Sequence, residues 1–193
     1  MKNYDIIIIG GGIAGASLAF MLARNPAAKS LRILLIEGEA FPGYHTTGRS
    51  AALYTTLYGS RVVRTLTRSS EGFLRNPHVG FAEHPLLTRR GALHLANDAD
   101  AWQLIALAED AERHGEAVQF LDFAGAREHV PALRPGATAR ALYVPEVWDI
   151  DVNALHQGFL RGAKGAGVTV EADAKLLSLN GKQALGRLSL QPE

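Results

Sequence analysis

The chain has 193 residues, a formal net charge of +1 and no cysteine. These features exclude disulfides, thiolate chemistry and cysteine-ligated metals, and they indicate neither nucleic acid nor an anionic membrane as an obligatory partner. The seven histidines form no pair at a ligand-like spacing, and no stretch approaches the roughly 20 apolar residues of a membrane helix. We therefore expect a cytoplasmic protein without a metal site, and leave a peripheral association with a membrane open.

The first 37 residues predict a βαβ unit. The apolar, β-branched run at residues 5–9 is typical of a parallel strand that is covered on both faces. Glycines follow, and residues 13–24 predict a helix that ends at Asn25-Pro26. Residues 31–36 predict a second buried strand, which is closed by Glu37. This order is typical of a parallel sheet with a right-handed crossover, as at the start of a Rossmann fold.

Two helices are expected next. Thr47 is a suitable N-cap for a helix that runs from Gly48 towards Tyr58. Residues 61–74 predict another helix, whose three arginines we interpret as a solvated face: Arg61, Arg64 and Arg68.

The remaining segments predict an antiparallel insertion and a return to the parallel sheet. Residues 86–95 alternate in polarity around Arg89-Arg90-Gly91, which is typical of a hairpin. The further expected elements are a helix at 99–114, a strand at 120–122, a helical turn that ends near 130, a strand at 141–144, a helix from Asp151 to Lys164 and a strand at 168–170. The predicted fold class is therefore α/β, with a Rossmann-type parallel sheet and part of an inserted antiparallel sheet.

The glycines after the first strand match the pattern G-x-G-x-x-G. Gly10 permits the tight turn, Gly12 lets the backbone approach a pyrophosphate, and Gly15 lets the helix pack against the sheet. The N–H groups of the helix start then face the phosphates. Glu37 is suited to accept hydrogen bonds from ribose hydroxyls and disfavours a 2′-phosphate. Together these residues predict a dinucleotide site, without choosing between NAD and FAD.

Four stretches carry a resemblance to a known family. The first is PGYHTTGRSAA at residues 42–52, followed by EHPLL at 83–87, DID at 149–151 and LHQGFLRG at 155–162. In this order they resemble the FAD-dependent D-amino acid oxidase/dehydrogenase family, with the bacterial catabolic D-arginine dehydrogenases as the nearest branch. The resemblance extends from the N-terminus to about residue 170.

This resemblance implies FAD as the cofactor, with the segment from Thr46 to Leu53 along the flavin. Small and hydroxylated side chains in that segment suit a close approach to a phosphate and a ring system. Arg49 is suited to pair with a phosphate or an acid, and we interpret His45 as a neutral histidine that bonds backbone, in preference to a catalytic base or a covalent flavin attachment point. The predicted cofactor-binding residues are Gly10, Gly12, Ile13, Ala14, Gly15, Glu37, Gly38, His45, Thr46, Thr47, Gly48, Arg49, Ser50, Ala51, Ala52, Leu53 and Lys175.

The family also implies a reaction. A D-α-amino acid, the small-molecule partner, is oxidised to an imino acid by hydride transfer to the flavin, and the imino acid is hydrolysed to a 2-oxo acid. Tyr58 matches the family's lid tyrosine and is the predicted catalytic residue, although a half-buried core tyrosine is an equal alternative. Gly59 suits a mobile loop. The electron acceptor is left open.

Two departures from the D-arginine dehydrogenases bear on the substrate. Leu53 stands where that branch has a histidine, and Ala92 falls near the position of a glutamate that grips the substrate guanidinium. A buried cation without an opposing carboxylate is costly to bind. We therefore expect a neutral or apolar substrate in place of arginine.

The resemblance implies a discontinuous FAD-binding domain at residues 1–82 and 149–193, and a partial substrate-binding domain at residues 83–148. Family members are longer, so we expect this chain alone to have little or no activity. Two alternatives stay open: a truncated, non-catalytic FAD-binding fragment, and a glycine, sarcosine or 2-hydroxyacid oxidoreductase of the same superfamily.

Overall fold

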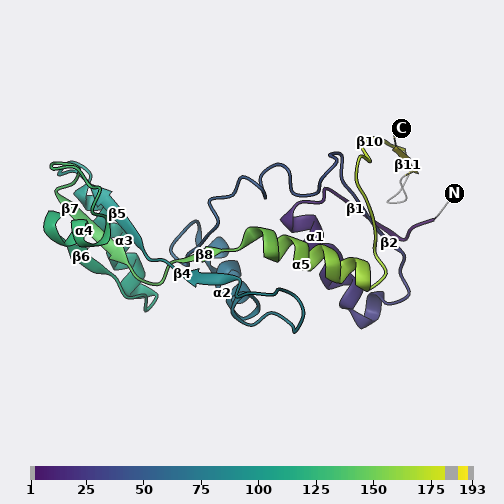
Figure 1. The fold of residues 1–193 in the computed structure, drawn as a ribbon, viewed down its shortest axis with the longest axis horizontal. Coiled ribbons are helices and arrows are strands. Elements are labelled where there is room, and N and C mark those ends of the chain that lie inside the picture. Colours follow the sequence, from purple (N-terminus) through teal and green to yellow (C-terminus); the bar gives the residue numbers. More distant parts are fainter. Residues whose placement is uncertain (1–2, 181–186, 191–193) are drawn as a thin grey trace. The chain divides into compact units, whose positions relative to one another are not determined.

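The computed structural model of the chain describes residues 3–180 and 187–190 and divides into two compact units (Figure 1). The first unit comprises Met1–Ala51, His78–His84 and Asp151–Glu193, and the second comprises Ala52–Pro77 and Pro85–Ile150. The segment from residue 52 to 77 thus packs with the antiparallel strands, although the sequence suggests a boundary near residue 82. Which unit binds cofactor and which binds substrate stays a prediction.

The first unit is built on a parallel sheet, as the βαβ pattern predicts. Its strands are β1 (Ile6–Ile9), β2 (Ile33–Ile36) and β9 (Thr169–Glu171), in the order β1-β2-β9. The register pairs Ile9 with Ile36 and Ile36 with Glu171, so the carboxyl ends of the three strands meet at one edge. All four residues of β2 are buried, because this strand has a neighbour on each side and is covered on both faces.

Two helices of the first unit lie side by side, α1 (Ile13–Arg24) and α5 (Val152–Gly165), and α1 packs on β1 and β2 (Figure 1). The Phe20 ring of α1 packs at 5.4 Å from the Phe159 ring of α5, measured between ring centroids. The Asp151 carboxylate caps α5 by accepting the Ala154 N–H at 2.8 Å, which confirms the predicted start of this helix. A short 3-10 turn, η1 (Pro26–Ala28), follows α1, and the strands β10 (Leu176–Asn180) and β11 (Arg187–Leu190) pair antiparallel.

The second unit contains two antiparallel sheets and three helices. One sheet has the order β3-β8-β4, from β3 (Leu53–Tyr54), β8 (Trp148–Ile150) and β4 (Leu87–Arg89). The other has the order β5-β7-β6, from β5 (Ala92–Ala96), β7 (Arg140–Val144) and β6 (Gln119–Leu121). The helices are α2 (Arg61–Arg75), α3 (Ala101–Arg113) and α4 (Phe123–His129).

The hairpin predicted at residues 86–95 is wrong. Its two strands belong to different sheets, because β4 pairs with β8 while β5 pairs with β7. The Arg90 and Gly91 N–H groups both donate to the Val147 carbonyl, at 3.0 and 2.9 Å, so the chain is held to a distant segment where a hairpin turn was expected. Alternation in polarity identified the strands but did not identify their partners.

The helix predicted from Gly48 towards Tyr58 is also wrong. The backbone forms successive turns up to residue 49 and then enters β3, which pairs with β8. The carbonyl of Ala52 accepts the Ile150 N–H at 2.8 Å, and this bond extends the pairing. Local capping signals were overruled here by sheet pairing with residues about a hundred positions away.

Within the described residues, no helix has both the length and the apolar character that a bilayer crossing requires.

Candidate cofactor site

The turn after β1 is the centre of the candidate site. Gly10 has a φ of +100°, a conformation that residues with a Cβ rarely adopt. Its N–H donates to the Ile36 carbonyl at 2.8 Å, which ties the turn to the end of β2. A Cβ at Gly15 would stand 1.9 Å from the Gly10 carbonyl oxygen, so only glycine lets the first turn of α1 lie this close to the loop.

Glu37 holds the loop through its carboxylate. One oxygen accepts the Gly11 N–H at 2.8 Å, and the other accepts the Glu39 N–H at 3.1 Å. A carboxylate has about four lone-pair sites, so acceptor capacity remains for a ligand hydroxyl. The backbone carbonyl of Glu37 accepts the Ala174 N–H at 2.8 Å, which brings the segment after β9 beside it. Lys175 follows there, and its Cα lies 4.0 Å from the position of a Cβ on Gly38.

Thr47 caps a helix, but not the one that the sequence suggests. Its hydroxyl oxygen accepts the Ile13 N–H at 2.9 Å, so it serves the first residue of α1 from 34 positions away. The N-cap residue of α1 is Gly12, which has no side chain to do this, and the first turn of α1 contains no acidic residue. The N-terminus of α1 therefore keeps its partial positive charge towards any anion placed there.

The rest of the segment from residue 42 to 51 is folded into turns. The Gly48 N–H donates to the Gly43 carbonyl at 2.8 Å, and His45 Nε2 lies 2.9 Å from a carboxylate oxygen of Glu39. His45 thus contacts a side-chain acid, whereas the sequence suggested a backbone partner. The Arg49 guanidinium lies over the Tyr44 ring, 5.3 Å from its centroid. Most of the segment's side chains are exposed.

A residue that the sequence did not assign also contacts the loop. His156 of α5 is 3% exposed, and its Nε2 lies 2.7 Å from the Gly11 carbonyl oxygen. The signal available in the sequence was a single histidine among the apolar residues of α5. Its partner is 145 positions away, so no local pattern reveals the contact.

The predicted site residues do not all fall in one unit. The glycine loop, Glu37, Gly38, Lys175 and residues 45–51 belong to the first unit, whereas Ala52, Leu53 and Tyr58 belong to the second. Tyr58 is 76% exposed, on the loop between β3 and α2. The hypothesis that it is a lid residue stays a prediction.

The loop that carries Tyr58 is anchored on both sides. Leu57 packs in an apolar cluster with Val144 and Val147, against which Ala92 also packs. On the other side, the Arg64 Nε donates to the Gly59 carbonyl at 3.0 Å. The backbone carbonyl of Gly59, which follows the predicted lid position, is thus fixed to helix α2.

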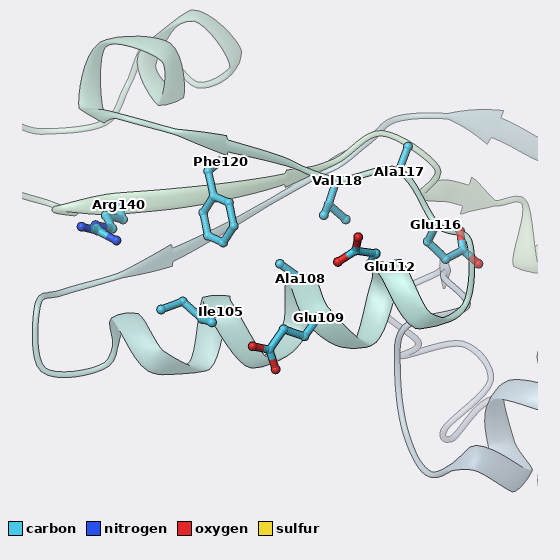
Figure 2. Close-up of a pocket in the computed structure, with 9 residues that line it drawn as sticks. All are labelled: Ile105, Ala108, Glu109, Glu112, Glu116, Ala117, Val118, Phe120 and Arg140. Atoms are coloured by element: carbon cyan, nitrogen blue, oxygen red, sulfur yellow. The ribbon is translucent and has the colours of Figure 1, made fainter.

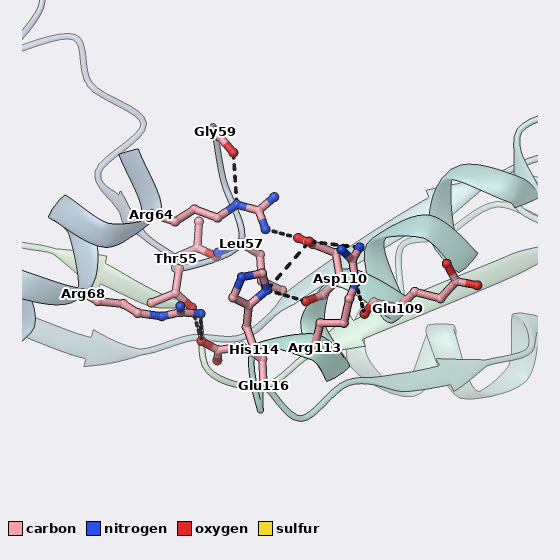
Figure 3. A network of polar contacts seen from close by, with 11 residues as sticks. Thr55, Leu57, Gly59, Arg64, Arg68, Glu109, Asp110, Arg113, His114 and Glu116 are labelled. Carbon is pink, nitrogen blue, oxygen red and sulfur yellow. Dashed lines mark hydrogen bonds and ion pairs between the residues drawn. The ribbon is translucent and has the colours of Figure 1, made fainter. Parts of the chain in front are cut away.

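Two arginines of α2 join a polar network with the end of α3 (Figure 3). Arg64 pairs with Asp110, and both side chains are about one-fifth exposed (18% and 19%). Arg68 pairs with Glu116 at 3.2 Å. Burial, and then the charges of these and a third arginine, lower the pKa of His114, which lies in the same network. The interpretation of Arg64 and Arg68 as a purely solvated face is therefore wrong.

A hollow of about 560 Å³ lies between α3 and β6 in the second unit (Figure 2). Its floor is apolar, and Phe120 points towards the helix across from Ile105 and Ala108. Carboxylates of α3 and the following turn border it, and none of the predicted site residues lines it. The described residues also contain no cluster of histidine and acidic side chains that suits a metal ion.

Comparison with known proteins identifies the fold. Residues 5–189 match the DAO family, described as FAD dependent oxidoreductase. The chain is similar to glycine oxidase from Geobacillus kaustophilus, with a TM-score of 0.81 and 22% identity over 98% of this chain and 52% of that one. It is also similar to L-α-glycerophosphate oxidase from Mycoplasma pneumoniae with FAD bound, with a TM-score of 0.83 and 17% identity over 100% of this chain and 51% of that one.

A shorter similarity comes from sequence alone. A stretch of 48 residues is 44% identical to the mitochondrial ubiquinone biosynthesis monooxygenase COQ6 of Drosophila melanogaster, and covers 24% of this chain and 10% of that protein. The chain spans about half the length of the two oxidases and a small part of the monooxygenase.

The residues of the glycine loop fit FAD. The loop has no side chain at Gly10, Gly11 or Gly12, the α1 N-terminus offers backbone N–H groups, and Glu37 stands at the end of the neighbouring strand with acceptor capacity. This is the donor and acceptor set that a pyrophosphate and a ribose require. Together with the family match over residues 5–189, it shows that the chain belongs to the DAO family of FAD-dependent oxidoreductases and that its cofactor is FAD.

Proposed function

We propose that the chain is the cofactor-binding portion of an oxidoreductase that oxidises the C–N bond of a D-amino acid. The observation that carries the proposal is the glycine loop, in which Gly11 and Ile13 are each held by a side chain from a distant element. The segment at residues 42–52, which resembles the D-amino acid oxidase/dehydrogenase family, supplies one of those side chains, Thr47. A cytoplasmic location and a small-molecule amino acid as partner belong to the same proposal.

The proposed roles follow from this geometry. Gly12 and the first turn of α1 would hold the pyrophosphate, and Glu37 would accept a ribose hydroxyl. Residues 45–53 would lie along the flavin, as the resemblance implies. When bound, FAD supplies the acceptor for the hydride that leaves the substrate carbon.

The second unit is the proposed source of substrate contacts. Tyr58 would cover the substrate, since its side chain is exposed while its neighbour Leu57 is buried. Ala92 begins β5, carries no carboxylate itself and packs against an apolar cluster. A guanidinium at this point would lose water without gaining a carboxylate. The proposal is therefore for a neutral or apolar D-amino acid.

A second candidate keeps the cofactor and changes the substrate. The similarity to glycine oxidase and to L-α-glycerophosphate oxidase includes enzymes named for an amine and for an alcohol. Glycine, sarcosine and 2-hydroxyacids are accordingly the competing substrates.

Anaerobic reduction of the flavin tests the proposal. The oxidoreductase that contains this chain as its cofactor-binding portion is purified with FAD and mixed without oxygen with D-amino acids, the matching L-amino acids, glycine, sarcosine, glycerol 3-phosphate and 2-hydroxyacids. The proposal expects loss of the oxidised-flavin absorption with neutral D-amino acids and little loss with D-arginine. Bleaching by glycine, sarcosine or the hydroxylated compounds, and by no D-amino acid, would favour the second candidate. A bound flavin that none of these compounds reduces would contradict the proposed oxidation of a D-amino acid.

A further inference from the structure

We propose that His156 is a positioning residue of the FAD site, which turns the Gly12 N–H towards the pyrophosphate by holding the Gly11 carbonyl. This inference rests on the assignment of the glycine loop to FAD.

The geometry of the contact fixes the role of the imidazole. His156 Nε2 lies 2.7 Å from the Gly11 carbonyl oxygen. A carbonyl oxygen only accepts hydrogen bonds, so Nε2 must carry the hydrogen. With the side chain 3% exposed, water does not replace this donor. If this buried carbonyl had no hydrogen-bond donor, the folded state would be destabilised by roughly 1–3 kcal/mol, the cost of desolvating the oxygen.

The planar peptide transmits this contact to the other side of the loop. The C=O of Gly11 and the N–H of Gly12 belong to one peptide unit, and the described peptides are all trans. In a trans peptide the two groups point in opposite directions. Because the Gly11 carbonyl points to the buried His156, the Gly12 N–H points away from the interior.

The neighbouring peptides are held in the same way. Glu37 accepts the Gly11 N–H at 2.8 Å, and Thr47 accepts the Ile13 N–H at 2.9 Å. Three successive peptide units of the loop are therefore each fixed by one side chain: Glu37 after β2, His156 of α5 and Thr47 of the 42–51 segment. His156 is the member of this set that holds the middle peptide.

The imidazole also contacts the segment that carries Thr47. A Cβ at Gly43 would lie 2.8 Å from His156 Cε1, so the ring packs directly against that glycine. His156 thus lies between the glycine loop and the 42–51 segment, the two parts of the first unit that the resemblance places on FAD. A residue that served only to fill the core would need no polar atom here, and its neighbours Leu155, Phe159 and Leu160 are apolar and buried.

Two substitutions separate a hydrogen-bonding role from a packing role. His156→Phe keeps a ring and removes the donor, whereas His156→Gln places an amide nitrogen the same number of bonds from Cα and keeps it. Phe159→Leu is the matched control, since it changes a buried ring on the same helix that packs on Phe20 and Phe81. FAD affinity is measured by quenching of flavin fluorescence, and loop protection by amide hydrogen exchange of the cofactor-free chain.

We expect His156→Phe to weaken FAD binding about tenfold or more, which corresponds to roughly 1.4 kcal/mol, and to speed amide exchange at residues 10–13. His156→Gln is expected to stay within about threefold of the wild type, because a net hydrogen bond contributes about 0.5–1.5 kcal/mol and is kept. Phe159→Leu should lower the melting temperature and leave exchange in the loop unchanged.

Wild-type affinity in His156→Phe, or equal losses in the Phe and Gln variants, would overturn the inference. If the wild-type chain bound no FAD, the cofactor assignment of the loop would fail for this chain. The exchange comparison would still decide the role of His156, because unchanged protection of residues 10–13 in His156→Phe would overturn it.

Discussion

Replacing Gly15 with alanine sets two physical effects against each other. Alanine is the better helix former, by about 1 kcal/mol within a helix, so propensity alone predicts a more stable protein. However, the new Cβ would stand 1.9 Å from the Gly10 carbonyl oxygen and 3.3 Å from Ile8 Cγ2. Both the Gly10 oxygen and the α1 backbone belong to the main chain, so no side-chain rotation relieves the contact.

The size of the effect follows from the distance. A carbon–oxygen contact of about 3.3 Å requires the loop and α1 to separate by roughly 1.4 Å from the 1.9 Å geometry. Overpacking of a core costs about 1–3 kcal/mol, and occasionally more. Because the 1.9 Å contact involves the main chain on both sides, we take the upper end, about 3 kcal/mol. After the gain in propensity of about 1 kcal/mol, we expect Gly15→Ala to lose about 2 kcal/mol, or a fall in melting temperature of about 4–8 °C for a chain of this size. FAD affinity should fall with it, because the displaced loop carries Gly12.

Thermal denaturation followed by circular dichroism, with and without FAD, measures this loss. Gly72→Ala is the matched control, since Gly72 lies in the last turn of α2 and a Cβ there meets nothing within 4 Å. We expect Gly72→Ala to raise the melting temperature slightly. A Gly15→Ala protein as stable as the wild type, or stabilised like the control, would refute the close-approach argument.

Three further substitutions test other parts of the structure. In Glu37→Gln an amide NH₂ must face either the Gly11 or the Glu39 N–H, so we expect a loss of about 1–3 kcal/mol in urea unfolding and weaker FAD binding; unchanged values would contradict the role of the carboxylate. Arg64→Met removes the more buried of the two arginines that pair with Asp110, and we expect a loss of about 2 kcal/mol with faster proteolysis at residues 55–60, while equal proteolysis rates would count against the anchor. Burial, and then the Glu71 charge, raise the pKa of Tyr54 from 10.0 to about 12. The contribution of this group to stability is therefore full below pH 10 and falls as the pH rises from about 10 to 12. Tyr54→Phe should lessen the fall in melting temperature over that pH range, and an identical fall in both proteins would contradict this role of Tyr54.

The elements that the sequence predicted well are those with local causes. Strand β1 and helix α1 are defined by signals that lie next to them in the sequence. These signals are the apolar run before Gly10, the glycine turn and the helix end at Asn25-Pro26. The predicted helix at residues 13–24 has the same bounds as α1. Helix α5 begins where Asp151 provides a cap, again a local effect.

The elements that the sequence did not predict depend on distant partners. Thr47 was identified as a cap, but its acceptor oxygen serves Ile13 and not its own segment. Strand β8 was not predicted. It pairs with β3, in a segment that was predicted as a helix, and with β4, which was predicted to form a hairpin. Sequence patterns describe which face of a segment is buried, and they leave open which segment covers it.

The same distinction holds for the candidate site. Gly10, Gly12, Gly15 and Glu37 could be assigned because each role follows from spacing in one βαβ unit. His156 could not be assigned, because its hydrogen bond to the loop joins two segments that are 145 positions apart in the sequence. The roles of Tyr58 and Ala92 depend on the resemblance and stay predictions.

Titration of the purified chain with FAD tests the assignment of the glycine loop, with ADP and NADH as competitors and Gly15→Ala as the variant with a displaced loop. We expect saturable quenching of flavin fluorescence by the wild-type chain, competition by ADP at the shared nucleotide half, weak competition by NADH, and a clear loss of affinity in Gly15→Ala. A chain that bound NADH in preference to FAD, or that bound FAD equally well with and without the Gly15 substitution, would contradict it.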